Sequence, residues 1–185
     1  LLEIYKMKKL SLEGLNFSTT EINIKNKIMT ITLDRPEKKN AMNNVMMNEI
    51  NYLLAYAKQE KDIRVVVFAA NGDIFCAGAD LSRTESKSNV PRLENSDDIS
   101  LSLRHLYKPV ICKIQGPVLA GALLIVSNAT HAIAVDEATF SAPEIHRGLW
   151  PFMVMAGLFR VMPKRAGLDF IMRGKPINSQ KAMKW

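Results

Sequence analysis

The stretch "FCAGADL", Phe75 to Leu81, decides how this sequence is interpreted. It follows directly on "RVVVFAANGDI", whose first part, Arg64 to Ala70, is an apolar and β-branched run typical of a strand buried on both faces. Small residues directly after such a strand leave backbone N–H groups uncovered. The sequence therefore predicts a turn at the end of a buried strand whose backbone can hold part of a ligand.

A second turn of the same kind follows another apolar run. "PVICKI", Pro109 to Ile114, predicts a second buried strand, and "GPVLAGALL" begins at Gly116. If the two strands are neighbours in one parallel sheet, their carboxyl ends lie side by side, which is where open α/β sheets bind ligands. One N–H from each turn would then point at a single oxygen, as in an oxyanion hole, and a helix beginning near Ala120 would add its dipole to the N–H of Gly121.

The rest of the chain predicts alternating strands and helices. Alternation from Phe17 to Leu33 indicates a β-hairpin, and a helix capped by Asn43 or Asn44 is expected to run to about Glu60. Further on we expect a polar loop over 82–98, a helix over about 97–106, a buried helix over 117–129, extended segments over 131–135 and 138–144, and helices from Phe152 onward, the last capped by Asn178 or Ser179. We expect a core over 15–150 and the start of a helical region over 151–185.

Composition narrows the class of protein. The chain of 185 residues is 48% hydrophobic and 23% charged, and its net charge of +7 comes from lysines and arginines that are scattered rather than gathered in one block, which disfavours nucleic acid as a partner. Cys76 and Cys112 sit in apolar runs without metal-ligand spacing, so we expect no metal site. No apolar run reaches the roughly 18 residues of a membrane helix. We expect a soluble, cytoplasmic protein that does not enter a membrane.

Four segments, taken in order, amount to a resemblance. "RPEKKNAMN", "NGDIFCAGADL", "KPVICKIQGPVLAGA" and "ATFSAPEIHRGLWP" together resemble the enoyl-CoA hydratase/isomerase family, also called the crotonase family. The resemblance implies an α/β fold, a crotonase-like spiral of repeated ββα units with C-terminal helices, assembled as a homotrimer or hexamer. It also implies an acyl-CoA thioester as substrate, so that coenzyme A belongs to the substrate and no separate cofactor is needed. Members of the family continue past the position of Trp185, so we expect a chain cut short there.

The same resemblance assigns roles to residues. Ala77 and Gly121 match the two backbone donors that bind the thioester oxygen as it becomes an enolate. The residues expected along coenzyme A are Lys38, Lys39, Ala77, Gly78, Ala79, Asp80 and Gly121. Two plainer interpretations stay open: Ala-Gly turns also allow tight packing of a strand against a helix, and exposed lysines are often only solvated.

The acids depart from the pattern of the family's hydratases, which carry two catalytic glutamates. Glu144 matches the second of them, whereas Leu124 occupies the position of the first. A leucine cannot hold or deprotonate water, so one-base chemistry that moves a double bond, as in the enoyl-CoA isomerases, is favoured. The alternatives are an enoyl-CoA hydratase, or a catalytically weak relative that binds coenzyme A or RNA. The alternative for Glu144 itself is a surface pair with Arg147.

Other side chains carry weaker signals. His146 lies beside Glu144, but a lone histidine near such a segment is more often structural, and His105 and His131 have no partner spacing. Ser141 lacks the context of a nucleophile elbow. The aromatic residues of "GLWPF", Trp150 and Phe152, line either an acyl pocket or the core.

Overall fold

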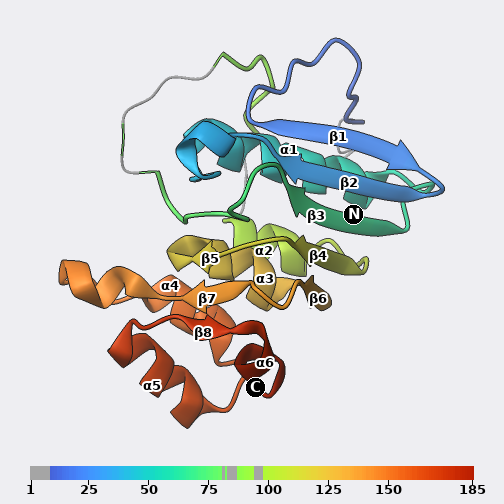
Figure 1. The fold of residues 1–185 in the computed structure, drawn as a ribbon. Coiled ribbons are helices and arrows are strands. Elements are labelled where there is room, and N and C mark those ends of the chain that lie inside the picture. The colour runs from blue at the N-terminus through green and yellow to red at the C-terminus, as the bar shows by residue number, and fades with distance from the viewer. Residues whose placement is uncertain (1–8, 81, 83–86, 94–97) are drawn as a thin grey trace, which may run out of the picture.

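The computed structural model describes residues 9–80, 82, 87–93 and 98–185, which form two sheets with helices packed against them (Figure 1). Its strands are β1 (Thr20–Lys25), β2 (Ile28–Leu33), β3 (Val65–Ala70), β4 (Val110–Ile114), β5 (Val118–Leu119), β6 (His131–Ala134), β7 (Thr139–Ser141) and β8 (Ile177–Asn178). Its α-helices are α1 (Asn44–Gln59), α2 (Ile99–Arg104), α3 (Leu123–Asn128), α4 (Phe152–Leu158), α5 (Lys164–Arg173) and α6 (Ser179–Met183). Three short 3-10 helices are η1 (Pro36–Lys38), η2 (Ala120–Ala122) and η3 (Pro143–Arg147). Parts of the predicted loop over 82–98, with Asp97 of the predicted helix, lie outside the described residues.

The larger sheet has five strands in the order β1-β2-β3-β4-β6. The predicted hairpin is confirmed: β1 and β2 are antiparallel, with Thr20 opposite Leu33 and Lys25 opposite Ile28. The turn residues Asn26 and Lys27 both have positive φ, 52° and 66°, which is the conformation that a two-residue hairpin turn requires. The other pairs in this sheet, from β2 to β6, are parallel.

The two buried strands that the sequence predicts are neighbours. β3 and β4 pair in parallel, with Val66 opposite Val110 and Phe68 opposite Cys112. All four side chains are almost fully buried. The carboxyl ends of β3 and β4 therefore lie at the same edge of the sheet, as the sequence analysis expects.

Helix α1 packs along the sheet and hydrogen-bonds to the start of the first strand, β1. Asn43 is its cap, since the side chain of Asn43 accepts the Met46 N–H at 2.8 Å. The buried face repeats at helical spacing, with Met46, Ile50, Leu53, Leu54 and Ala57. On the same helix, fully buried Glu49 accepts hydrogen bonds from the backbone of Ser18 and Thr19 and from the hydroxyls of Thr19 and Thr20.

The predicted helix over 117–129 is wrong in its first half. Val118 and Leu119 form strand β5, which pairs in parallel with Phe140 and Ser141 of β7, and an α-helix begins only at Leu123. Pairing with a strand some twenty residues further along decides the conformation here. Ala120 then turns the chain with a φ of +52° before the helix can start.

Two smaller corrections come from the same three-stranded sheet, whose order is β5-β7-β8. The extended segment predicted over 138–144 is strand only as far as Ser141, because Pro143 starts the 3-10 helix η3. The C-terminal part is helical as predicted except for β8, which pairs with β7, and Asn178 rather than Ser179 caps the last helix.

One hydrophobic core connects the two halves of the fold. It includes Phe68 from β3, Leu123 from α3, Phe140 from β7, and Leu158 and Ile171 from α4 and α5. In Figure 1 the helices α5 and α6 lie at the end of the molecule opposite the β1–β2 hairpin, with strands β5, β7 and β8 between them and the hairpin. The turns after β3 and β4 thus lie near the middle of the molecule.

Candidate active site

The first turn, residues 71–80, ends in a stretch that runs parallel to the segment after β2. Ala79 forms a parallel bridge with Met42: the Met42 N–H donates to the Gly78 carbonyl at 2.7 Å, and the Asp80 N–H donates to the Met42 carbonyl at 2.9 Å. Successive N–H groups of an extended segment point to opposite sides. The N–H of Ala79 therefore points away from Met42, and no acceptor within the described residues bonds to it.

The second turn, residues 115–121, is held directly against the first. Cys76 bridges to Val118, and the Leu119 N–H donates to the Cys76 carbonyl at 3.0 Å. A Cβ built on Gly121 would lie 3.6 Å from the backbone nitrogen of Ala79. The N–H of Gly121 belongs to the first turn of η2, where N–H groups have no partner within the helix.

The donor pair that this geometry offers is Ala79 with Gly121. The N–H of Ala77 donates to the Lys39 carbonyl at 3.0 Å. The Ala77 N–H is therefore already hydrogen-bonded within the protein, which corrects the expectation that Ala77 supplies a donor to a ligand. The two turns do approach each other as expected, and the small residues of "CAGAD" are what allow the approach.

Glu144 follows the strand that pairs with the second turn. Leu119 lies opposite Ser141 in the β5–β7 pair, so Gly121 and Glu144 come two and three residues after paired positions. The Oε2 atom of Glu144 is buried and has no hydrogen-bond partner within the described chain. Burial raises the pKa of the Glu144 carboxyl above its ordinary value. No ion pair joins Glu144 to the exposed Arg147 in this part of the chain, so a surface pair does not account for the carboxylate.

Leu124 lies in the first turn of α3, three residues after Gly121. It is half-buried and packs against the core, while its carbonyl accepts a hydrogen bond from the Asn128 side chain at 2.8 Å. The two acids nearest to it in the later sequence, Asp136 and Glu137, are exposed between β6 and β7. At this position the chain offers an apolar surface and no acid.

The carboxylate of Asp80 is bound within the protein. Its Oδ2 lies 2.9 Å from the guanidinium of Arg35, and both side chains are almost completely buried. Ser82 donates to its other oxygen from the hydroxyl at 2.6 Å and from the backbone at 2.9 Å. These bonds from Ser82, with Arg35, lower the pKa of Asp80 to about 2. Asp80 thus stabilises the turn and does not present its carboxylate to a ligand.

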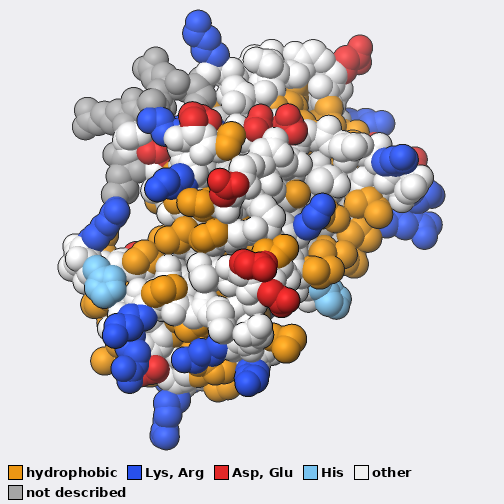
Figure 2. All heavy atoms as spheres, in the orientation of Figure 1, with side chains coloured by type: hydrophobic (Ala, Val, Ile, Leu, Met, Phe, Trp, Pro, Cys, Tyr) orange, Lys and Arg blue, Asp and Glu red, His pale blue; other side chains and the backbone are white. Residues whose placement is uncertain are grey.

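Lys38 and Lys39 lie beside the first turn, because the carbonyl of Lys39 accepts the N–H of Ala77. Both side chains are exposed. On the face drawn in Figure 2, lysine and arginine side chains are distributed around the outline, with acidic and apolar side chains between them. The positive charge is thus not gathered into one block on that face.

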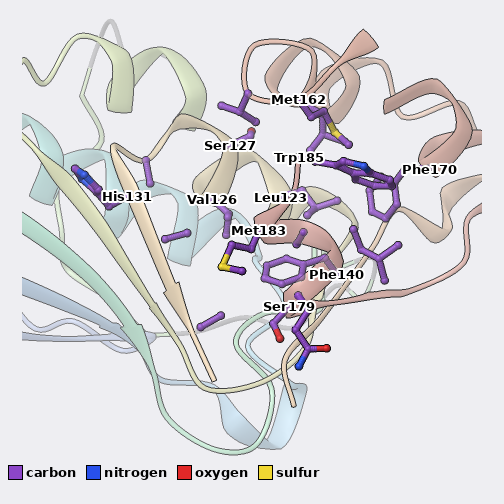
Figure 3. A pocket seen from close by; sticks show the side chains of 18 of the residues that line it. Leu123, Val126, Ser127, His131, Phe140, Met162, Phe170, Ser179, Met183 and Trp185 are labelled. Carbon is purple, nitrogen blue, oxygen red and sulfur yellow. The ribbon is translucent and has the colours of Figure 1, made fainter. Parts of the chain in front are cut away.

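A separate cavity of about 520 Å³ lies on another face of α3 (Figure 3). Its walls include Leu123 and Val126 of α3 together with the rings of Phe140, Phe170 and Trp185. Ala79, Gly121, Leu124 and Glu144 do not line it. This cavity is therefore distinct from the site formed by the two turns.

The other candidates take no part in a cluster. His146 bonds to the Gly174 carbonyl at 3.3 Å, and Phe152 is 68% exposed while Trp150 is half-buried. The described residues contain no group of His, Cys, Asp and Glu that could hold a metal ion. None of the described helices is long and apolar enough to cross a membrane. The side chains of Arg35 and Asn40 also connect the loop after β2 to the first turn. Neither residue is among the predicted site residues, and the segment "RPEKKNAMN" is the only signal for them in the sequence.

The parallel pairing from β2 to β6 and the two adjoining Ala-Gly turns agree with a crotonase-type α/β protein. The sequence model of the enoyl-CoA hydratase/isomerase family matches residues 23–185, and the chain belongs to this family. The resemblance seen in the sequence and the predicted fold are both confirmed.

Individual relatives agree with this assignment. The chain is 27% identical over 160 residues to the human protein named enoyl-CoA hydratase domain-containing protein 3, mitochondrial, covering 84% of this chain and 53% of that protein. It is 28% identical over 165 residues to mevalonyl-coenzyme A hydratase of Aspergillus fumigatus, covering 85% and 60%. A crystal structure of an enoyl-CoA hydratase/isomerase from Mycobacterium paratuberculosis superposes with a TM-score of 0.80 at 24% identity, covering 91% of this chain and 68% of that one.

The chain thus spans little more than half the length of these curated relatives. Because the human relative is named as mitochondrial, the expected cytoplasmic location stays a prediction. The expected trimer or hexamer also stays a prediction.

Proposed function

We propose that this protein acts on an acyl-CoA thioester and moves a carbon–carbon double bond by one-base chemistry at Glu144. The observation that supports this best is the buried, unpartnered Oε2 of Glu144, in a chain that has Leu124 where a second acid would be needed. Burial raises the pKa of the Glu144 carboxyl, and a carboxylate that is more basic than an ordinary glutamate is better suited to taking a proton from carbon and returning it.

In the proposed reaction the substrate is a 3-enoyl thioester. Glu144 removes a proton from C2, and the electron pair moves into the thioester carbonyl to give a dienolate whose oxygen is bound by the N–H groups of Ala79 and Gly121. The protonated Glu144 then returns the proton at C4, the double bond closes between C2 and C3, and Glu144 is a carboxylate again. Each backbone donor could supply roughly 3 to 4 kcal/mol to the dienolate, by analogy with other oxyanion holes.

The remaining residues of the turns have supporting roles in this proposal. Gly78 lets the two turns approach each other so that the N–H groups of Ala79 and Gly121 can bind one oxygen, and Asp80 holds the first turn through Arg35. Lys38 and Lys39, which are exposed beside the first turn, would bind the phosphates of coenzyme A in this proposal.

A hydratase is the second candidate, because the relatives carry this name. Hydration needs a group that holds and deprotonates water in addition to Glu144, and Leu124 cannot do so. One paired assay distinguishes the isomerase from the hydratase.

The test is a paired assay of the purified protein on a 3-enoyl-CoA and on crotonyl-CoA, with Glu144→Gln as control. We expect isomerisation of the first substrate, little hydration of the second, and loss of isomerisation in the variant. Hydration at a comparable rate would mean that another group replaces the missing acid, and a fully active Glu144→Gln would remove Glu144 from the mechanism.

A further inference from the structure

Asn40 lies in the loop between β2 and α1 and contacts the first turn. The residue is 1% exposed, and its backbone has a φ of +52°, a left-handed conformation that asparagine tolerates better than most residues. A buried amide in a loop needs partners for its oxygen and for its two N–H groups.

Those partners come from two different segments. The Oδ1 atom of Asn40 accepts the Arg35 N–H at 2.8 Å, within its own loop. Its Nδ2 group donates to the carbonyls of Asn71 and Ile74, at 2.8 Å and 2.9 Å. The amide therefore joins the loop after β2 to the beginning of the first turn.

The backbone around Asn40 continues this attachment along the turn. The Cys76 thiol donates to the Asn40 carbonyl at 3.0 Å, and burial raises the pKa of that thiol to about 12, so it keeps its proton. The Ala77 N–H donates to the neighbouring Lys39 carbonyl, as described above. Residues 76–80 thus lie along residues 39–42 through a series of bonds, and the Ala79 N–H is the donor in that stretch left pointing to the other side.

We propose that Asn40 is a positioning residue for the oxyanion donor at Ala79. Its amide fixes where the loop after β2 meets the chain after β3, and the bonds of Lys39, Asn40 and Met42 transmit that placement to the Ala79 N–H. Asn40 itself does not touch the substrate. This inference rests on the function proposed above, in which Ala79 and Gly121 bind the thioester oxygen.

An error in this placement should reduce turnover more than binding. A donor displaced by about 1 Å can cost on the order of 100-fold in rate, whereas coenzyme A makes contacts elsewhere that survive the displacement. For Asn40→Ala we expect kcat on a 3-enoyl-CoA to fall about 10- to 100-fold with KM changed less than about 3-fold. Asn40→Gly removes the amide but permits the positive φ without strain, so it should lose the same activity if the amide is what matters.

Lys108→Met is the matched control for a general loss of stability. The Lys108 ammonium donates to the carbonyl of Ala57 in the last turn of α1 and to those of Glu60 and Ile63 just after this helix. It therefore also joins segments that are distant in sequence, but at the amino-terminal end of β4. We expect Lys108→Met to lower the unfolding midpoint and to leave kcat within about 3-fold. If Lys108→Met lowers kcat as much as Asn40→Ala does, Asn40 is only a structural residue and the proposal is wrong.

Two spectroscopic measurements test the placement itself. The carbonyl band of a ¹³C-labelled thioester bound to the protein should shift to lower frequency when two N–H donors polarise it, and Asn40→Ala should reduce that shift while Lys108→Met retains it. Amide hydrogen exchange does not depend on any activity: Asn40→Ala should speed exchange at Ala77 and Asp80, and unchanged exchange there would overturn the proposal. If the wild-type protein acts on neither substrate, the proposed function fails, and the exchange result alone decides whether Asn40 holds the turn.

Discussion

Gly78 packs so closely against Ala120 that a side chain at position 78 would have no room. A Cβ built on Gly78 would be 2.7 Å from the Cβ of Ala120 and 3.0 Å from both the Gly121 nitrogen and the Leu119 carbonyl oxygen. Gly78 also has a φ of +89°, a backbone conformation that side chains disfavour. The approach of the two turns therefore depends on glycine at this position.

Gly78→Ala is predicted to separate the two turns. We expect a loss of about 2–4 kcal/mol in the free energy of unfolding, from the strained φ together with the contact, and a loss of at least about 100-fold in activity on a 3-enoyl-CoA. Gly14→Ala is the control, since Gly14 has a similar φ of +72° but open space around it. It should cost only about 1 kcal/mol and leave activity intact. Equal effects from the two variants in urea unfolding would show that the contact with Ala120 is unimportant.

The ion pair of Asp80 with Arg35 predicts how stability responds to acid. The pKa of Asp80 is about 2 in the folded protein, below its ordinary value of 3.8, because Ser82 and Arg35 stabilise the carboxylate. A lowered pKa contributes stability above the unfolded-state value, which is lost as the pH falls from about 4 to about 2. We expect Asp80→Asn to be less stable than the wild type at pH 6, with the difference shrinking towards pH 2.

Urea unfolding at several pH values checks this, with Asp62→Asn as the control. Asp62 is 86% exposed and pairs with Lys27 at 3.6 Å, so its contribution should be small at every pH. A constant difference between Asp80→Asn and the wild type from pH 6 to pH 2 would contradict the assignment of this pKa.

Much of the fold could be predicted because its signals are local. The alternation of β1 and β2, the apolar runs of β3 and β4, and the spacing of α1 each lie within one short segment. Strand β5 could not be predicted, because its two residues are extended through pairing with β7 and otherwise resemble the start of the apolar helix that follows.

The site shows the same limit at the level of single atoms. The sequence offers three small residues, Ala77, Gly78 and Ala79, and any of their N–H groups could face a ligand. Hydrogen bonds to Lys39 and Met42, nearly forty residues earlier in the chain, determine which N–H is available to a ligand. The Ala77 N–H donates to the Lys39 carbonyl, whereas the Ala79 N–H points away from Met42. Likewise, the sequence places Glu144 at the site only through its family resemblance, while the burial of its unpartnered oxygen depends on how η3 packs.

Glu49 is predicted to be one of the most sensitive positions for stability. Its fully buried carboxylate accepts several hydrogen bonds from Ser18, Thr19 and Thr20, so it holds the start of β1 against α1. Glu49→Gln turns one acceptor into a donor facing these donors, and we expect a loss of about 2–4 kcal/mol in the free energy of unfolding. Glu13→Gln, at an exposed position, should change it by less than about 0.5 kcal/mol. Similar urea midpoints for both variants would mean that Glu49 does not anchor β1.

Glu144→Gln is predicted to make the protein more stable while removing its activity. The folded structure raises the pKa of Glu144, so it favours the protonated form, and stability is lost as the pH rises through that pKa. Below about pH 4.5 the carboxyl is neutral in both the folded and the unfolded chain, and wild type and variant should be equally stable. Above it the wild type carries a carboxylate with a buried, unpartnered oxygen. A neutral amide costs less to bury without a partner than a carboxylate does, so the variant should gain up to about 1 kcal/mol at pH 7.

The measurement is thermal or urea unfolding of both proteins between pH 4 and pH 8, alongside the isomerase assay. Glu137→Gln serves as the control, because Glu137 is exposed and its substitution should change neither stability nor rate. The wild-type rate should also fall on the acid side with an apparent pKa above the ordinary glutamate value, since only the carboxylate can remove the C2 proton. A Glu144→Gln protein that is less stable than the wild type at pH 7 would show that the carboxylate is held by favourable contacts, and the reason for expecting a raised pKa would be gone.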